Sequence, residues 1–289
     1  MEKGNTVNVN SKKAVISAGD HLFIFISPKQ MYPLKVVPKE TFQTKFGPIK
    51  HNDLIGVKYG TKLNLSKGWV YVLPFTPELW TLNLPHRTQI LYSTDISMIT
   101  CQLNLKPGSV VIESGTGSGS LSHAIIRTIA PDGFLHTFDF HLARANEARK
   151  EFDDHGLTSL VRVENRDVCQ DGFGLKAIAD ALFLDLPHPW TAIPFAYEAM
   201  KPFGSRICCF SPCIEQVQKT VQALQSMCFM DIGTMELVSR PFETKQMKME
   251  KFCFTETPES ESNTTNDVKA VPSIQIAGHT GFLTFATKI

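Results

Sequence analysis

Residues 113–120 read Glu-Ser-Gly-Thr-Gly-Ser-Gly-Ser, a run of small residues with glycine at every second position from 115 to 119. An apolar run at 109–113 precedes it and predicts a β-strand, and a helical pattern follows it. Small side chains let the backbone approach a ligand closely, and a helix N-terminus favours polar or anionic groups. The spacing is E-x-G-x-G-x-G, which differs from the dinucleotide pattern G-x-G-x-x-G. We therefore expect a strand–turn–helix ligand site here.

Strand and helix patterns alternate after this stretch. Strands are predicted at 134–139, 161–164, 181–184 and 206–210, and helices at 143–155, 190–200 and 214–227. A helix at 88–103 precedes the glycine-rich stretch, and a last strand is predicted at 282–287. Alternation at crossover spacing is typical of a doubly wound, parallel sheet. The sequence thus predicts a Rossmann-like α/β domain over residues 81–289.

The first part of the chain has a different pattern. Residues 1–14 are polar and rich in asparagine, which predicts a flexible tail. Residues 15–80 contain short β-rich runs at 21–26, 35–37 and 69–73 with Gly and Pro between them, and we expect a small N-terminal β-barrel. Residues 255–273 are polar, acidic and rich in turn formers, which predicts a disordered insertion in the α/β domain.

The composition is that of an ordinary globular protein, with 289 residues, 43% apolar residues and a net charge of +1. It excludes collagen-like, wholly disordered and disulfide-scaffold classes. The charge is uneven, since residues 1–85 hold 11 lysines against 5 acids and residues 86–289 hold 18 basic against 23 acidic residues. A net charge of +6 beside −5 indicates a polyanion contact separate from a catalytic body, although lysines on solvated strand edges give the same count.

Cysteine usage and hydropathy restrict the cellular compartment. The 7 cysteines are odd in number and several lie in apolar runs, which indicates reduced thiols of an intracellular protein. Cys209 and Cys213 lack a histidine or second cysteine pair beside them, so no metal site is expected. No apolar run reaches the roughly 18 residues that span a membrane. The N-terminus lacks a signal-peptide core, so we expect no membrane contact and a cytosolic or nuclear protein.

Acidic residues end or closely follow four successive predicted strands, namely Glu113, Asp139, Asp167 and Asp185. The carboxyl ends of parallel strands meet at one edge of the sheet, where open α/β folds bind ligands. A carboxylate at Asp139 can bridge two ribose hydroxyls, and one at Asp167 can accept from an adenine amino group. So many carboxylates repel a phosphate-rich dinucleotide and favour a cationic sulfonium such as S-adenosylmethionine. Single acids could instead cap helices.

Five motifs indicate a family: PHRTQILYSTD (85–95), ESGTGSGSLSHAI (113–125), DLPHPW (185–190), FSPCIEQV (210–217) and GHTGFLTFATK (278–288). From about residue 43 to the end, outside 255–273, the chain resembles the catalytic subunit of eukaryotic tRNA (adenine-58, N1)-methyltransferases, which are class I S-adenosylmethionine-dependent enzymes. The resemblance implies methyl transfer from S-adenosylmethionine to N1 of an adenine in the T-loop of tRNA. It also implies a nuclear heterotetramer of two catalytic subunits and two non-catalytic, homologous tRNA-binding subunits, with tRNA or partner contacts through residues 15–80.

The resemblance assigns cofactor-binding roles to Leu91, Glu113, Gly115, Gly117, Ser118, Gly119, Ser120, Asp139, Arg144, Asp167, Val168 and Asp185. The family more often has Glu in place of Asp139. Asp185 is the expected catalytic residue. Adenine N1 is itself the nucleophile, so a buried carboxylate that accepts from N6–H would orient the base and stabilise the developing positive charge. The same carboxylate could take a proton from N6.

The target base lies inside a folded loop and must be extruded to reach a pocket. The candidate tRNA-contacting residues are Lys45, Gly47, His86, Arg87, Gln89, Pro187, Trp190, Ser211, Pro212, His279 and Thr280. Trp190 could instead be part of the core, and His86 and Arg87 could cap a helix. Lys45 and Gly47 could belong to a solvated loop.

Two other functions remain possible from the sequence. Isoaspartyl-type protein carboxyl methyltransferases share this sheet, although the D-x-P-x-x-W loop and the basic β region disfavour that reading. A non-catalytic RNA-binding scaffold would predict a broken glycine turn and no acid at position 185, and here both are intact.

Overall fold

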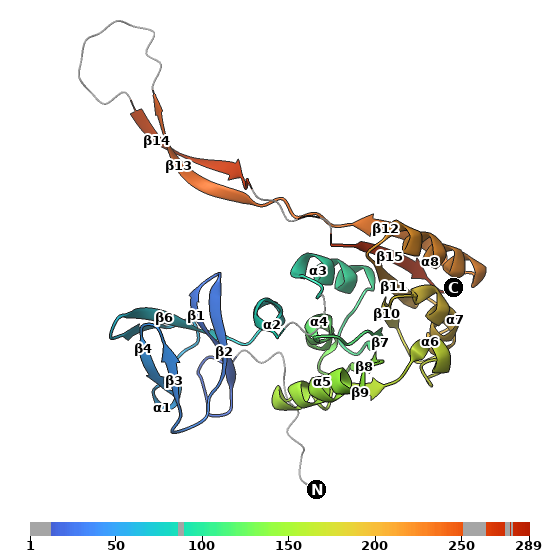
Figure 1. Ribbon diagram of the computed structural model, residues 1–289, viewed down its shortest axis with the longest axis horizontal. Coiled ribbons are helices and arrows are strands. Elements are labelled where there is room, and N and C mark those ends of the chain that lie inside the picture. The colour runs from blue at the N-terminus through green and yellow to red at the C-terminus, as the bar shows by residue number, and fades with distance from the viewer. Residues whose placement is uncertain (1–12, 86–89, 251–263, 275–277, 279) are drawn as a thin grey trace, which may run out of the picture. The chain divides into compact units, whose positions relative to one another are not determined.

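The computed structural model describes residues 13–85, 90–250, 264–274, 278 and 280–289, and it begins with antiparallel strands. One sheet has the order β2–β1–β6–β5. Its strands are β1 (His21–Ser27), β2 (Gln30–Lys35), β5 (Lys62–Leu65) and β6 (Gly68–Pro74) (Figure 1). A separate hairpin is formed by β3 (Thr41–Thr44) and β4 (Gly47–Lys50), followed by α1 (His51–Leu54). The described strands thus form two antiparallel sheets, and the predicted closed barrel is not confirmed.

Strand β1 is buried on both faces because three successive residues in it are apolar. Leu22 and Ile24 join the core of the N-terminal sheets. Phe23 points to the opposite face, as alternate strand residues do, and packs with Trp80. Trp80 belongs to α2 (Pro77–Asn83), the first helix after the sheets. The same strand therefore builds one core and contacts the helix that leads into the next part of the chain.

The second part is a seven-stranded sheet of order β12–β15–β11–β10–β7–β8–β9. Strands β7 to β11 are mutually parallel, and β15 is antiparallel to β11. Their bounds are β7 (Val110–Ser114), β8 (Phe134–Asp139), β9 (Val161–Asn165), β10 (Ala181–Asp185), β11 (Arg206–Ser211), β12 (Met230–Glu236) and β15 (Phe282–Thr287). This confirms the predicted Rossmann-like α/β fold. The strand order reverses between β7 and β10, and ligands bind at such a point in open α/β sheets.

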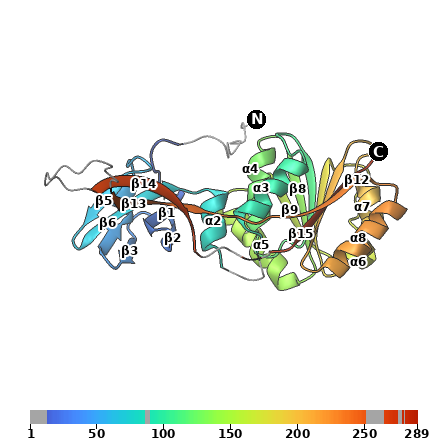
Figure 2. The ribbon, with the colours of Figure 1, turned by 90° about the horizontal axis from the view of Figure 1, so that it is seen from above.

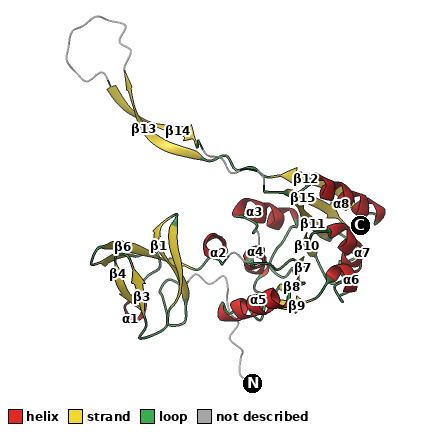
Figure 3. Ribbon diagram, viewed as in Figure 1, coloured by secondary structure: helices red, strands yellow, loops and turns green. Residues whose placement is uncertain are grey.

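Helices cover both faces of this sheet (Figures 1 and 3). One face carries α3 (Ser93–Gln102), α4 (Ser120–Ile129) and α5 (Leu142–Asp154), and the other carries α6 (Val168–Asp171), α7 (Pro189–Ala199) and α8 (Ile214–Ser226). The helix predicted at 88–103 is observed from Ser93, and residues 86–89 lie outside the described part. Among the helices of the described ranges, none is both long and apolar enough to cross a membrane.

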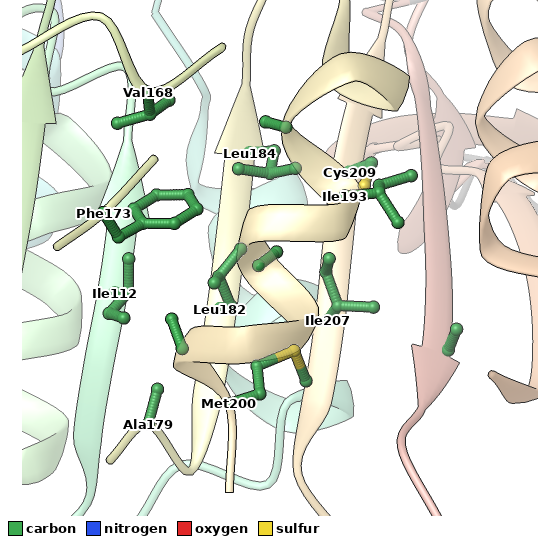
Figure 4. Packing of buried hydrophobic residues seen from close by; sticks show 14 of the residues in the cluster. Ile112, Val168, Phe173, Ala179, Leu182, Leu184, Ile193, Met200, Ile207 and Cys209 are labelled. Atoms are coloured by element: carbon green, nitrogen blue, oxygen red, sulfur yellow. The ribbon is translucent and has the colours of Figure 1, made fainter. Parts of the chain in front are cut away.

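A buried apolar cluster fixes the strand ends that meet at the reversal point (Figure 4). Ile193 of α7 packs with Leu182 of β10 and Ile207 of β11. Val168 and Phe173, from the segment after β9, join the same cluster. Fully burying a side chain of this size contributes about 1.5–3 kcal/mol. The carboxyl edge of the sheet is therefore held on a rigid base.

Strands β13 (Phe242–Glu250) and β14 (Thr264–Pro272) form an antiparallel ribbon, visible in Figures 1 and 2. Residues 236–280 form a compact unit of their own. The predicted disorder over 255–273 is wrong for residues 264–272, and 251–263 lie outside the described residues. Continuous main-chain pairing and the β-branched Val268 and Val271 stabilise this strand, which a polar composition conceals.

Candidate cofactor pocket and active site

The glycine-rich turn joins β7 to α4 in a backbone conformation that favours glycine. Gly115, Gly117 and Gly119 have φ angles of +97°, +53° and +75°. A side chain at Gly115 would also overlap the backbone carbonyl of Asp185, so the turn and the end of β10 are in direct contact. The N-terminus of α4 therefore lies at the carboxyl edge of the sheet, where its free N–H groups favour a polar ligand.

A pocket opens at this turn. It is lined by Ile90, Leu91, Glu113, Gly115, Thr116, Gly117, Ser118, Gly119, Ser120, Leu121, Phe183 and Asp185. The pocket thus brings together eight of the twelve predicted cofactor residues. Sequence reasoning missed four others, Ile90, Thr116, Leu121 and Phe183, which flank the predicted positions in the chain.

Ser120 connects three elements at the wall of the pocket. Its hydroxyl donates to the backbone carbonyl of Leu91 over 3.0 Å. It also shares a 2.8 Å hydrogen bond with the hydroxyl of Thr81 from α2. The first residue of α4 is therefore tied both to the segment before α3 and to the helix that follows the N-terminal sheets.

Glu113 lies at the base of the pocket with its carboxyl group buried. It accepts hydrogen bonds from Ser122 at 2.6 Å and Thr137 at 2.7 Å. Burial raises the pKa of Glu113 to about 7, and the nearby carboxylates of Asp185 and Asp139 act in the same direction. Glu113 thus links β7, β8 and α4, and its charge changes near neutral pH.

Asp139 ends β8 and is almost fully buried. One carboxylate oxygen accepts from the backbone N–H of Gly117 at 3.1 Å, and the other accepts from the N–H of His141 at 2.8 Å. The guanidinium of Arg144 donates to the same group, with its Nε atom at 3.1 Å. Arg144 therefore neutralises Asp139 from α5, and the carboxylate is held directly beside the glycine turn.

Asp167 and Val168 lie outside the lining of this pocket. The carboxylate of Asp167 accepts from the backbone N–H of Cys169 at 3.0 Å and caps the short helix α6. Val168 is buried in the cluster beneath α7 (Figure 4). Helix capping, left open by the sequence, accounts for the local geometry of Asp167.

Asp185 ends β10 and is one of the residues that line the pocket. The side chain is partly buried, and no residue within the described ranges donates a hydrogen bond to it. Burial raises the pKa of Asp185 to about 6. The group is therefore mostly ionised at pH 7 and can accept a hydrogen bond from a ligand.

The loop after Asp185 is held by α8. Gln216 donates its amide N–H to the carbonyl of Pro187 at 3.0 Å, and its amide oxygen accepts from the N–H of Cys213 at 3.2 Å. Trp190 packs on the core, and the ammonium of Lys219 lies 4.9 Å from its ring centre. Gln216 is a structural residue of the site that sequence reasoning missed, although it lies within the FSPCIEQV motif.

Ser211 ends β11, the strand beside β10. Its side chain is fully buried, and its hydroxyl has no hydrogen-bond partner among the described residues. Gly281 pairs closely with this strand end, since a side chain there would overlap the ring of Phe210. Pro212 follows Ser211, whereas Thr280 belongs to the separate unit of residues 236–280.

The remaining predicted tRNA-contacting residues are away from the pocket or undescribed. Lys45 and Gly47 lie at the turn of the β3–β4 hairpin, where the Lys45 ammonium donates to Gln30 at 2.6 Å. Gly47 has φ +130°, and a side chain there would meet the hydroxyl of Ser66. The predicted contacts His86, Arg87, Gln89 and His279 lie outside the described residues.

The sheet order with an antiparallel β15, a glycine turn after β7 and acids at the strand ends together define a Rossmann-like methyltransferase fold. A solved S-adenosylmethionine-dependent O-methyltransferase from Thermotoga maritima has this fold, with a TM-score of 0.77 and 27% identity over 96% of this chain and 95% of its own. The chain belongs to the family described as the tRNA methyltransferase complex GCD14 subunit, whose model matches residues 68–270.

Two relatives place the chain within this family. A tRNA (adenine(58)-N(1))-methyltransferase catalytic subunit from Cryptococcus neoformans is 49% identical over 232 residues, covering 79% of this chain and 53% of the relative. The chain thus spans about half the length of that relative. The corresponding subunit from Dictyostelium discoideum is 40% identical over 301 residues and covers 94% of this chain and 96% of the relative.

Proposed function

We propose that this chain transfers a methyl group from S-adenosylmethionine to N1 of adenine 58 in the T-loop of tRNA. The observation that supports it best is the position of Asp185, whose backbone carbonyl lies against the glycine turn and which lines the pocket. Membership of the GCD14 family and the names of the relatives give the substrate. In this proposal the chain is the catalytic subunit of a heteromeric complex.

The residues of the pocket fit S-adenosylmethionine. Gly115, Gly117 and Gly119 line the pocket without side chains, so a ligand can approach the backbone of the turn. The backbone of residues 115–120 would hold the methionine part at the start of α4. Asp139 would accept from the ribose hydroxyls, since a carboxylate offers about four acceptor positions and, in the described part of the chain, hydrogen bonds from Gly117, His141 and Arg144 use three. Carboxylates around the site also suit the positive charge of a sulfonium.

S-adenosylmethionine supplies an electrophilic methyl group when it is bound. The lone pair of adenine N1 accepts this group, so no nucleophilic side chain is required. Asp185, ionised above about pH 6, would accept a hydrogen bond from the N6 amino group and orient N1. The base gains positive charge as N1 is methylated, and the same carboxylate stabilises that charge.

The wall for the extruded base would come from the loops after β10 and β11. Pro187 is fixed by Gln216, and Ser211, whose buried hydroxyl has no partner among the described residues, would lie directly beneath this wall. Pro212 extends this wall. Trp190 packs on the core and on Lys219, which favours support of the loop over direct stacking.

The charge of the chain supports the presence of a partner subunit. Affinity for tRNA depends on neutralising phosphates, and a net charge of +1 provides little excess positive charge for that purpose. The basic residues 1–85 would contact tRNA or the partner, with Lys45 at an exposed hairpin turn. We include in the proposal a non-catalytic, homologous tRNA-binding partner, a heterotetramer of two plus two subunits, and residence in the nucleus.

The test is transfer of a radiolabelled methyl group to a tRNA transcript, with and without the partner subunit. We expect label at adenine 58, lost when that position is guanine, and a rate at least about 100-fold lower for Asp185→Ala. Asp171→Ala, at an exposed acid of α6, is the control and should keep full activity.

Other outcomes would contradict the proposal. Label at adenine 58 that survives Asp185→Ala overturns the role of the carboxylate. Label in protein instead of tRNA indicates a carboxyl methyltransferase. Absence of any label with the partner present indicates an RNA-binding scaffold.

A further inference from the structure

Three side chains behind the glycine turn form a group that we call the histidine cluster. It consists of His123 on α4, Glu151 on α5 and His155 at the end of α5. Their ligating atoms all lie within 4.8 Å of one another. None of the three is among the residues that line the cofactor pocket or carry out the proposed methyl transfer.

His123 contacts the glycine turn directly. Its Nδ1 atom lies 2.7 Å from the carbonyl oxygen of Gly119. The carbonyl can only accept, so Nδ1 is the donor. A side chain at Gly119 would lie 3.4 Å from Glu151 Oε1 and 3.6 Å from His123 Nδ1, so the back of the turn packs on the histidine cluster. The other side of the same turn lines the pocket.

His155 holds the ring of His123 in place. The Nε2 atom of His123 and the Nδ1 atom of His155 are hydrogen-bonded at 2.9 Å. Burial lowers the pKa of His155 to about 3, and the neighbouring His123 and His21 act in the same direction. His155 is therefore neutral, and its ring is enclosed edge-on by Trp80 of α2 and His21 of β1, with ring centres at 4.8 Å and 4.9 Å.

A cation could also use such a trio of donors, but the spacing favours direct hydrogen bonding. Two imidazole nitrogens on one tetrahedral zinc ion, each about 2.0–2.1 Å from the metal, lie roughly 3.4 Å apart. The two ring nitrogens here are 2.9 Å apart, which is an ordinary hydrogen-bond length.

We propose that His123 is a positioning residue of the cofactor pocket. It anchors the Gly119 carbonyl from behind the turn, and His155 fixes its orientation. The inference rests on the proposed function in one respect, namely that the pocket binds S-adenosylmethionine. His155 packs against His21 of β1 and Trp80 of α2. These N-terminal elements therefore help to hold His155, and through it His123, in the orientation that reaches the Gly119 carbonyl.

The experiment measures binding of S-adenosylhomocysteine, the demethylated form of the cofactor, by calorimetry on the full chain with its partner. His123→Leu removes the side-chain donor to the Gly119 carbonyl, which then keeps the bond from the backbone N–H of residue 123 at 3.2 Å, and should raise the Kd about tenfold. His123→Asn places an amide N–H where Nδ1 lies and should stay within about threefold of wild type. His155→Leu keeps the hydrogen bond between His123 and the Gly119 carbonyl but leaves the His123 ring free to rotate. We expect an increase in Kd between those of the two His123 variants.

A matched control separates positioning from folding. His51 is another buried histidine whose Nδ1 atom is bonded to the backbone, accepting from the N–H of Val37 at 2.9 Å. His51→Leu should lower the melting temperature but leave the Kd unchanged. In steady-state assays, His123→Leu should raise the KM for S-adenosylmethionine more than it lowers kcat.

The outcomes are distinguishable from those of the function test. Equal Kd values for wild type and His123→Leu overturn the positioning role while leaving the methylation proposal intact. Binding that is weakened by His123→Leu in a protein that does not methylate tRNA supports positioning and overturns the methylation proposal. Loss of binding on adding a metal chelator overturns the direct hydrogen bond.

Discussion

The backbone carbonyl of Asp185 occupies the space that a side chain at Gly115 would require. This contact joins the end of β10 to the turn after β7, at the point where the strand order of the sheet reverses. The acid expected to contact the base and the turn expected to hold the cofactor therefore share one rigid contact. The two segments already touch here, so this contact sets how closely the turn and the end of β10 approach each other.

Gly115→Ala should disrupt both functions. The added methyl group meets backbone instead of a flexible side chain, and φ of +97° is unfavourable for alanine. We expect the free energy of unfolding to fall by about 2–4 kcal/mol and the affinity for S-adenosylhomocysteine to fall at least about tenfold. Denaturant unfolding and calorimetry measure these effects.

Gly108 provides the control for this substitution. It has a similar φ of +87°, but nothing lies within 4 Å of an added Cβ. Gly108→Ala should therefore cost only the backbone strain, about 1–2 kcal/mol, and keep cofactor affinity. Equal losses of affinity in the two variants would contradict the proposed contact.

The pH dependence of methyl transfer should report Asp185. Because the pKa of this carboxyl is raised to about 6, the group loses its charge below that pH and can no longer accept from N6–H as an anion. We expect kcat/KM to rise with pH up to about 6 and then level off. Asp185→Asn should have low activity without this acid limb. If kcat/KM of Asp185→Asn still rises with pH near 6, the titrating group is a residue other than Asp185.

Glu113 should make the stability of the protein depend on pH. Its folded-state pKa of about 7 lies above the ordinary 4.5, so the native state binds the extra proton between these values. The stabilisation is fully present below pH 4.5 and is lost as pH rises through 7, on the order of 2–3 kcal/mol. Glu113→Gln keeps an acceptor for Ser122 and Thr137 and removes this titration.

Urea unfolding at pH 5 and pH 8 measures this effect. Glu113→Gln should lose less stability than wild type between the two values. Glu40→Gln, at an exposed glutamate, should match wild type at both. A wild-type protein with equal stability at pH 5 and pH 8 would argue against a buried, titrating Glu113.

Local pattern was sufficient to predict the parallel strands β7 to β11, the strand β15 and the glycine turn, but not β12 or β13. The apolar run at 181–184 corresponds to β10, and the helix predicted at 214–227 corresponds to α8, because periodicity and turn residues act over a few positions. The runs predicted at 21–26 and 69–73 correspond to β1 and β6, but the run at 35–37 overlaps β2 only at Lys35. Barrel closure depends on pairing between distant strands. The same limit applies to β14, whose stability comes from pairing with β13.

Contacts between residues that are far apart in the chain could not be predicted from the sequence pattern. Asp167 follows a strand as a ligand-binding acid would, but a helix cap has the same local signature, and its side chain bonds to Cys169. The hydrogen bond between His123 and His155 joins α4 to the end of α5. Spacing along the chain cannot reveal such a pair, since it requires knowledge of which helices pack side by side.

Gln216→Ala should affect catalysis more than cofactor binding. The amide donates to Pro187 O from the first turn of α8 and so holds the loop after Asp185. Without this bond the loop gains freedom, and the base is positioned less accurately relative to the carboxylate. We expect kcat to fall about tenfold with the Kd for S-adenosylhomocysteine unchanged. Gln218→Ala, two residues further along α8 at an exposed position, should behave like wild type. If Gln216→Ala weakens cofactor binding and leaves kcat intact, the loop serves the cofactor side of the pocket and the assignment of Pro187 to the base wall is wrong.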